Sequence, residues 1–213
     1  MNNKKNIEKC VLLLIIFLIY TFMIKFIDVK AIGPENTSVG FASLNEPFHN
    51  LFGYNSVLYL ITKVLGIVAL MFVAFYGFIG LVQLIKKKNL FKVNKDILIL
   101  GVFYIIVLAT YIFFEKVVIN YRPVILDEGL EASFPSSHTI LGLFVCFSGI
   151  MINERIIKQK YRKNLNIFLK LLGILILVGR LFSGVHWLTD IMAGVLISCA
   201  LVNLLKFALR VEE

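Results

Sequence analysis

The sequence predicts an all-α, polytopic membrane protein with six transmembrane helices. Of its 213 residues, 59% are hydrophobic, and the mean hydropathy is +0.88. Soluble domains contain about 45–50% apolar residues, so a soluble globular class is excluded. The charged residues gather between long apolar stretches, as they do in multispan proteins. No internal repeat or domain boundary divides the chain, so we expect a single membrane domain over residues 1–213.

Each expected span is a window of mainly apolar residues about as long as a bilayer is thick. The six windows are 11–27, 57–85, 97–114, 136–152, 165–179 and 187–205. The first window follows basic residues, as the hydrophobic region of a signal peptide does. Residues 29–31 form a poor cleavage site, however, which indicates an uncleaved span. The fourth and fifth windows are short, so their ends are expected to extend or to be buried in protein.

The formal net charge of +9 fits membrane topology better than nucleic-acid binding, because the basic residues lie beside apolar segments. Basic clusters before the first span, after the second and after the fourth fall on one side, which predicts cytoplasmic termini. The remaining basic residues fall on the outer side: Lys25, Lys30, Lys63, Lys116, Arg122 and Arg180. The segments 28–56, 115–136 and 180–186 fall there too, so the unusual polar residues converge on the outer face.

The outer segment 28–56 contains a candidate helix start, with Asn45 as N-cap and Pro47 in the first turn. Phe48, Leu51 and Phe52 then form an apolar stripe suited to the membrane interface. This stretch is either a loop anchored by aromatic residues or a lid over a site.

Residues 180–190 form a polar island between the last two spans and contain Arg180, His186 and Asp190. Ionisable side chains in or beside membrane spans are costly and usually serve a function. If the last helix begins near His186, Asp190 lies one turn later on the same face. Its carboxylate can then accept a hydrogen bond from one imidazole nitrogen, which leaves the other nitrogen free as a nucleophile or base. A structural hydrogen bond accounts for the pair equally well.

A second polar cluster opens the fourth span. Pro135 sets a turn, and Ser136 or Ser137 can cap the helix that follows. The free N–H groups of the first helical turn favour an anion, and His138 lies at that positive helix end.

Two arginines, Arg122 and Arg180, flank these clusters from other segments. A guanidinium group binds phosphate oxygens through a bidentate fork, so the two can hold a dianionic phosphate. Glu128 and Glu131 are the alternative partners for these arginines.

Together these residues resemble the three signature motifs of the type 2 phosphatidic acid phosphatase superfamily, which also includes vanadium haloperoxidases. The resemblance covers roughly residues 57–205. It consists of Arg122-Pro123, then residues 135–138, then Arg180, five residues, His186, three residues and Asp190.

Three positions depart from the family pattern. The lysine of the first motif falls on Glu115, and Lys116 follows one residue later, so Lys116 is the expected substitute. The second motif has Ser137 where glycine is usual, and the third has Gly179 where serine is frequent.

The resemblance implies a metal-independent lipid phosphatase without a cofactor. His186 is then the nucleophile that forms a phosphohistidine, Asp190 orients it, and His138 protonates the leaving oxygen. The phosphate would be bound by Arg122, Arg180, the Ser136 hydroxyl, the Ser137 backbone N–H and Lys116.

The expected substrate is a lipid phosphate or diphosphate of the outer leaflet, such as undecaprenyl diphosphate, phosphatidylglycerophosphate or phosphatidic acid. A lipid phosphotransferase of the same fold is the nearest alternative. A small membrane transporter or lipid-flipping protein is an alternative from another class.

Overall fold

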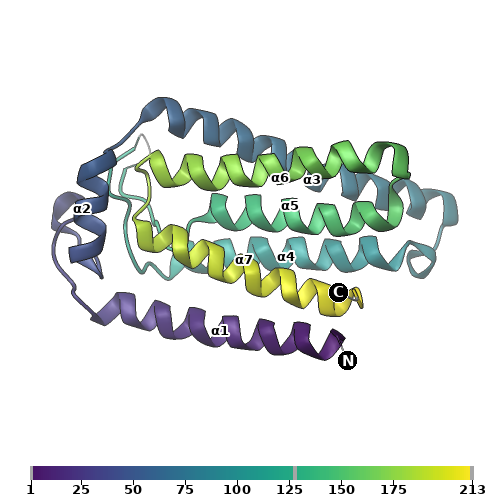
Figure 1. Cartoon of the computed structure of the whole chain (residues 1–213), viewed down its shortest axis with the longest axis horizontal. Helices are drawn as coiled ribbons and strands as arrows, with labels where there is room; N and C mark the ends of the chain where they lie inside the picture. Colours follow the sequence, from purple (N-terminus) through teal and green to yellow (C-terminus); the bar gives the residue numbers. More distant parts are fainter. Residues whose placement is uncertain (1, 127–128, 212–213) are drawn as a thin grey trace.

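The computed structural model describes residues 2–126 and 129–211, and the described part is helical without a named strand. Six of its helices are long and apolar enough to cross a membrane (Figure 1). They are α1 (Asn2–Phe26), α3 (Ser56–Lys87), α4 (Lys95–Lys116), α5 (Ser137–Ile156), α6 (Gln159–Phe182) and α7 (Leu188–Ala208). The prediction of an all-α, multi-pass membrane protein is confirmed.

Helix α5 lies at the centre of the bundle and packs against α3, α4, α6 and α7. Both short predicted spans extend as expected, because α5 continues to Ile156 and α6 already begins at Gln159. The two helices are tied at this turn by an ion pair between Arg162 Nε and Glu154 Oε2 at 3.1 Å. The polar residues 159–164 therefore belong to a helix that projects beyond its apolar window.

The spanning helices run side by side, and their connections alternate between two ends of the bundle (Figure 1). Both termini lie at one end, where Asn6 Nδ2 donates to the Val211 carbonyl at 3.3 Å. Helix α2 (Ala42–Phe52), the α4–α5 loop and the α6–α7 loop lie at the other end. The segments with the candidate site residues therefore meet at the end opposite the termini.

Helix α2 begins at Ala42, so the prediction that Asn45 is its N-cap is wrong. Asn45 is buried, and its Nδ2 donates to the Gly40 carbonyl and to Thr189 Oγ1, each at 2.9 Å. Its Oδ1 accepts from the Thr189 N–H at 3.2 Å. These tertiary hydrogen bonds replace the expected capping role and fasten α2 to the first turn of α7.

Candidate active site

The α6–α7 loop, residues 183–187, packs closely against the connection between α2 and α3, residues 53–55. The Asn55 N–H donates to the Ser183 carbonyl at 3.0 Å. Gly184 has a φ of +68°, and a Cβ there would lie 1.9 Å from the Gly53 carbonyl oxygen. Only glycine fits both the backbone conformation and the close approach. The loop therefore joins Arg180, at the end of α6, to His186 in a fixed geometry.

Asp190 is the centre of a buried hydrogen-bond network. Its Oδ2 accepts from the Trp187 N–H at 3.0 Å and from the Ser133 hydroxyl, and its Oδ1 accepts from Asn120 Nδ2 at 3.1 Å. The last helix begins at Leu188, so His186 precedes it and the expected one-turn spacing of His186 and Asp190 does not apply. Asp190 joins the start of α7 to both sides of the α4–α5 loop instead of bonding directly to His186.

His186 bonds to Ser133. Its Nδ1 lies 3.1 Å from the Ser133 carbonyl oxygen and 3.4 Å from the Ser133 hydroxyl. A carbonyl can only accept, so this contact assigns the hydrogen to Nδ1 and the lone pair to Nε2. Nε2 is buried and has no hydrogen-bond partner in the described part of the chain.

Burial lowers the pKa of His186 well below its ordinary range, and the charges of Arg122, Arg180 and His138 lower it further. The hydrogen bond to the Ser133 backbone acts in the opposite direction. The imidazole is therefore neutral at neutral pH. A neutral ring whose Nε2 lone pair is free has the form that a nucleophile requires.

Arg180 is a fully buried cation whose guanidinium group lacks hydrogen-bond partners. Its relative exposure is 0%, and Nε, Nη1 and Nη2 are all unpaired among the described residues. Its Cζ lies 5.3 Å from the centroid of the Tyr59 ring, which offers a cation–π contact. Buried charges are normally paired, so a bare guanidinium indicates a site for an anion.

One side of the Arg122 guanidinium group forms an ion pair with a carboxylate. Its Nη2 lies 2.8 Å from Glu131 Oε2, while Nε and Nη1 are buried without partners. The alternative pairing with Glu131 therefore applies to part of the Arg122 guanidinium and leaves its other side free for an anion. Glu128, the other alternative partner, lies outside the described residues.

The start of α5 adds backbone donors to the site. Ser136 is fully buried, donates its N–H to the Asp190 carbonyl at 3.1 Å and accepts from the Thr139 hydroxyl at 3.0 Å. Its hydroxyl makes no capping bond to the helix, and the bond that it accepts from Thr139 leaves its own hydrogen free to be donated to a ligand. The helix begins at Ser137, whose N–H belongs to the first turn and has no intrahelical acceptor.

His138 lies against α3. A Cβ placed on Gly66 would be 3.0 Å from His138 Cδ2 and 3.3 Å from Nε2. Gly66 therefore leaves room for the imidazole between α3 and α5. The charges that act on His138 are those of Arg180, Arg122 and Lys63, so it faces the same cationic centre as His186.

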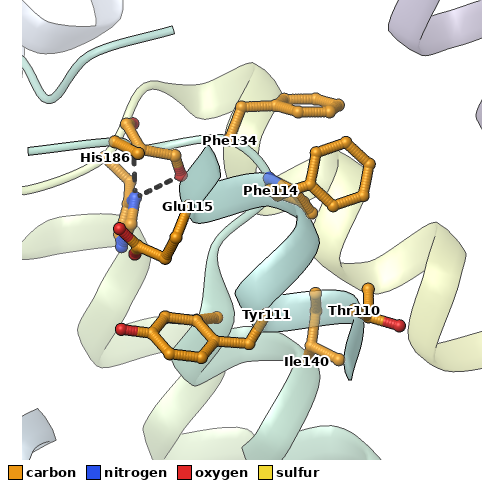
Figure 2. A pocket seen from close by; sticks show the side chains of 11 residues that line it. Thr110, Tyr111, Phe114, Glu115, Phe134, Ile140 and His186 are labelled. Carbon is orange, nitrogen blue, oxygen red and sulfur yellow. Dashed lines mark hydrogen bonds between the residues drawn. The ribbon is translucent and has the colours of Figure 1, made fainter. Parts of the chain in front are cut away.

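The side chain of Lys116 is exposed and does not line the pocket beside His186. Figure 2 shows the narrow pocket beside His186, which is lined by Tyr111, Phe114 and Glu115 of α4. Lys116 ends α4, is exposed and is absent from the lining of both described cavities. Successive residues on a helix point about 100° apart, which explains why Glu115 faces the pocket and its neighbour does not.

The presence of Gly179, where the third motif frequently has serine, also has a steric reason. A Cβ there would lie 2.5 Å from Thr62 Cγ2, because α6 passes close to α3 at this point. A serine side chain would therefore collide with Thr62 at this position.

An apolar cavity of about 550 Å³ opens between α3, α4 and α5; we call it the α3–α5 groove. Its walls are mainly aliphatic and aromatic side chains, and its polar residues include Lys63, Ser137 and His138. A groove of this composition can hold hydrocarbon chains with a polar group at one end.

Four residues of this region were not predicted from the sequence as site residues: Asn120, Ser133, Tyr59 and Lys63. Ser133 and Asn120 belong to the two sides of the α4–α5 loop, where Ser133 N–H donates to the Asn120 carbonyl at 2.9 Å. Neither residue shows a periodic spacing that could have identified it. Lys63 did carry a signal, because it is a lone charge inside an apolar span.

Within residues 2–126 and 129–211, no cluster of three or more His, Cys, Asp or Glu side chains is arranged to hold a metal ion. The site described above gathers the charges of Arg122 and Arg180 around His186 and His138, and His138 also lines the apolar groove.

Comparisons with known proteins find similarities in sequence and in fold. No curated protein matches the chain in sequence. The fold is similar to the crystal structure of a transmembrane PAP2-type phosphatidylglycerolphosphate phosphatase from Bacillus subtilis, with a TM-score of 0.66 and 19% sequence identity. That similarity covers 96% of this chain and 98% of the other. Residues 118–210, which include all three motif clusters, match the family model of the PAP2 superfamily. The chain is therefore similar to the PAP2 superfamily over residues 118–210, and its fold is similar to that of a PAP2-type phosphatase.

Proposed function

We propose that the protein is a metal-independent phosphatase that hydrolyses a lipid phosphate or diphosphate at the extracytoplasmic membrane face. The observation that carries this proposal is the bare Arg180 guanidinium, whose charge acts on both His186 and His138, together with the α3–α5 groove that His138 also lines. A phosphate group satisfies the unpaired donors, and the groove accommodates the hydrocarbon chains. One ligand class therefore explains both the unpaired donors and the apolar groove.

In the proposed reaction, His186 Nε2 attacks phosphorus and forms a phosphohistidine while the bond to the lipid oxygen breaks. His138 donates the proton that the leaving oxygen needs. A water molecule then attacks the phosphohistidine, with His138 accepting its proton, and inorganic phosphate leaves. Asp190 acts on His186 through Ser133, whose carbonyl oxygen fixes the ring.

The charge that develops on the phosphoryl oxygens is stabilised by fixed donors. Arg180 and the free side of Arg122 supply guanidinium N–H groups, and the Ser136 hydroxyl and the Ser137 N–H supply neutral ones. Donors that are already in place need no reorganisation during the reaction, which is the main source of stabilisation in phosphoryl transfer. The arginines then serve the electrostatic purpose that a metal ion serves in other phosphatases.

The assay is phosphate release by the purified protein from a panel of lipid phosphates in detergent, with EDTA present. We expect activity in the wild type and none in His186→Ala, together with an acid-labile phosphoprotein in the wild type. His49→Phe is the matched control, because His49 packs its ring 5.5 Å from that of Trp187 and its Nδ1 has no partner among the described residues. Full activity of His186→Ala would refute the proposal.

The proposed sidedness rests on the basic clusters of the sequence and on the position of both termini opposite the site. A fluorescent reporter fused to the C-terminus should fold in the cytoplasm, and an alkaline phosphatase fused there should be inactive. An active alkaline phosphatase fusion would reverse the assigned orientation.

A further inference from the structure

Lys63 is an isolated charge within a membrane-spanning helix. It is the only charged residue of α3 between Ser56 and Ile85. No carboxylate pairs with it within the described ranges 2–126 and 129–211. A cation at such a depth is costly, and its side chain normally faces a polar or ligand-binding cavity. Lys63 lines the α3–α5 groove together with Ser137 and His138.

The aromatic ring of Tyr59 links Lys63 to the proposed phosphate site. Lys63 Nζ lies 5.3 Å from the Tyr59 ring centroid, and Arg180 Cζ also lies 5.3 Å from it. The two cations therefore contact the same ring, one at the groove and the other in the buried centre. Lys63 is also separated from Gly66 by about one helical turn, so both lie on the face of α3 that meets His138.

The charge of Lys63 acts on His138, which is one of the two histidines of the site. The charges acting on His138 are those of Arg180, Arg122 and Lys63. Those acting on His186 are the charges of Arg122, Arg180 and His138, without Lys63. The nucleophile and the leaving oxygen lie on opposite sides of phosphorus in an in-line displacement. Lys63 therefore stands on the side from which the leaving group departs into the groove.

We propose that Lys63 binds an anionic group within the leaving part of the substrate and selects lipids that carry one. Two kinds of lipid share this chemistry. The leaving group of a prenyl diphosphate is a prenyl monophosphate, and that of phosphatidylglycerophosphate contains a phosphodiester. The leaving group of phosphatidic acid is an uncharged diacylglycerol, which a cation at this point does not stabilise. This inference rests on the proposed phosphatase function and narrows its substrate class.

The experiment compares kcat/KM of the purified protein on farnesyl diphosphate, phosphatidylglycerophosphate and phosphatidic acid in detergent micelles. Lys63→Met should lower kcat/KM by about tenfold or more on the substrates with an anionic leaving group, since it removes a charged hydrogen bond. The loss on phosphatidic acid should stay below about threefold, and Lys63→Arg should restore much of the selectivity. If only one of the anionic classes is affected, that class is the ligand of Lys63.

Lys170→Gln is the matched control, because it removes an exposed lysine of the spanning helix α6 that lies outside both cavities. Inhibition by orthovanadate gives a second measurement, since vanadate occupies the position of the reacting phosphate alone. Its inhibition constant should stay unchanged in Lys63→Met and rise in Arg180→Lys. Where Lys63→Met does not fold, Lys63→Gln takes its place.

An equal loss on all three substrates, no loss on any, or the same pattern in Lys170→Gln would overturn the inference while the phosphatase function stands. A wild-type protein that releases phosphate from none of the lipids would instead overturn the proposed function itself.

Discussion

Replacing Arg180 by Met tests whether its guanidinium group serves a ligand or the fold. Methionine fills a similar elongated volume but removes the charge and every N–H donor. These donors have no hydrogen-bond partner in the described chain, and the group makes a cation–π contact with the Tyr59 ring. The substitution therefore removes few interactions from the folded state and many from a bound phosphate.

The expected loss of activity follows from the geometry of the group. A guanidinium fork forms about two charge-assisted hydrogen bonds to a phosphate, each contributing about 1.5–3 kcal/mol. Their removal weakens transition-state binding by about 3–6 kcal/mol, which corresponds to a kcat/KM lower by about 10²- to 10⁴-fold. Arg180→Lys keeps the charge but cannot form the fork, so we expect an intermediate loss of about 10- to 100-fold.

The expected effect on stability has the opposite sign. The cation–π contact with Tyr59 contributes about 0.5–2 kcal/mol, whereas burying an unpaired charge costs several kcal/mol, so the melting temperature of Arg180→Met should be unchanged or higher. The assays are phosphate release from micellar lipid and thermal unfolding in the same detergent. A melting temperature that falls by several degrees, or activity within about threefold of the wild type, would refute the assignment of Arg180 as a phosphate ligand.

Two further predictions concern the histidines. The pKa of His186 lies below its ordinary value of about 6.5, so the neutral nucleophile should persist when the pH falls below 6.5. The acid-side decrease of kcat/KM should therefore occur at a pH below about 6.5. Arg122→Gln removes one of the charges that lower this pKa, so the acid limb should move to higher pH on the same substrate; a limb that stays or moves down would contradict the reasoning. Gly66→Ala places a methyl group 3.0 Å from His138 Cδ2, so kcat should fall by about tenfold or more as the imidazole is displaced. Gly77→Ala, on the same helix with nothing within 4 Å of its added Cβ, should leave kcat unchanged, and an equal loss in both variants would show a general effect on α3.

The membrane spans could be predicted from the sequence because they depend on the length of local apolar runs. Helix ends were less predictable, as Asn45 shows. Its position before a glutamate and a proline is typical of an N-cap, but its side chain bonds to Thr189 across a sequence separation of 144 residues. No local pattern contains that contact.

The three motif clusters were predicted from residue type and spacing, but the way they connect was not. The position of Ser133 between His186 and Asp190 depends on how the α4–α5 loop folds back on itself. The choice between Glu115 and Lys116 depends on the rotation of α4, where one residue changes the direction by about 100°. Both outcomes are set by tertiary contacts, so only the structure could decide them.

The polar groups of the site divide into those that are satisfied without a ligand and those that are not. Asp190 already accepts hydrogen bonds from Trp187, Ser133 and Asn120, so it contributes to the folded state before any substrate arrives. The donors of Arg180 have no partner in the described chain, so their burial costs free energy unless an anion accepts from them, and the Nε2 lone pair of His186 likewise has no partner. The satisfied network holds the unsatisfied groups in place, since it fixes the loop that contains Ser133, the acceptor for His186. A bound phosphate, as proposed, would accept from the Arg180 donors and relieve that cost, so we expect the affinity of the site for an anion to depend on Arg180.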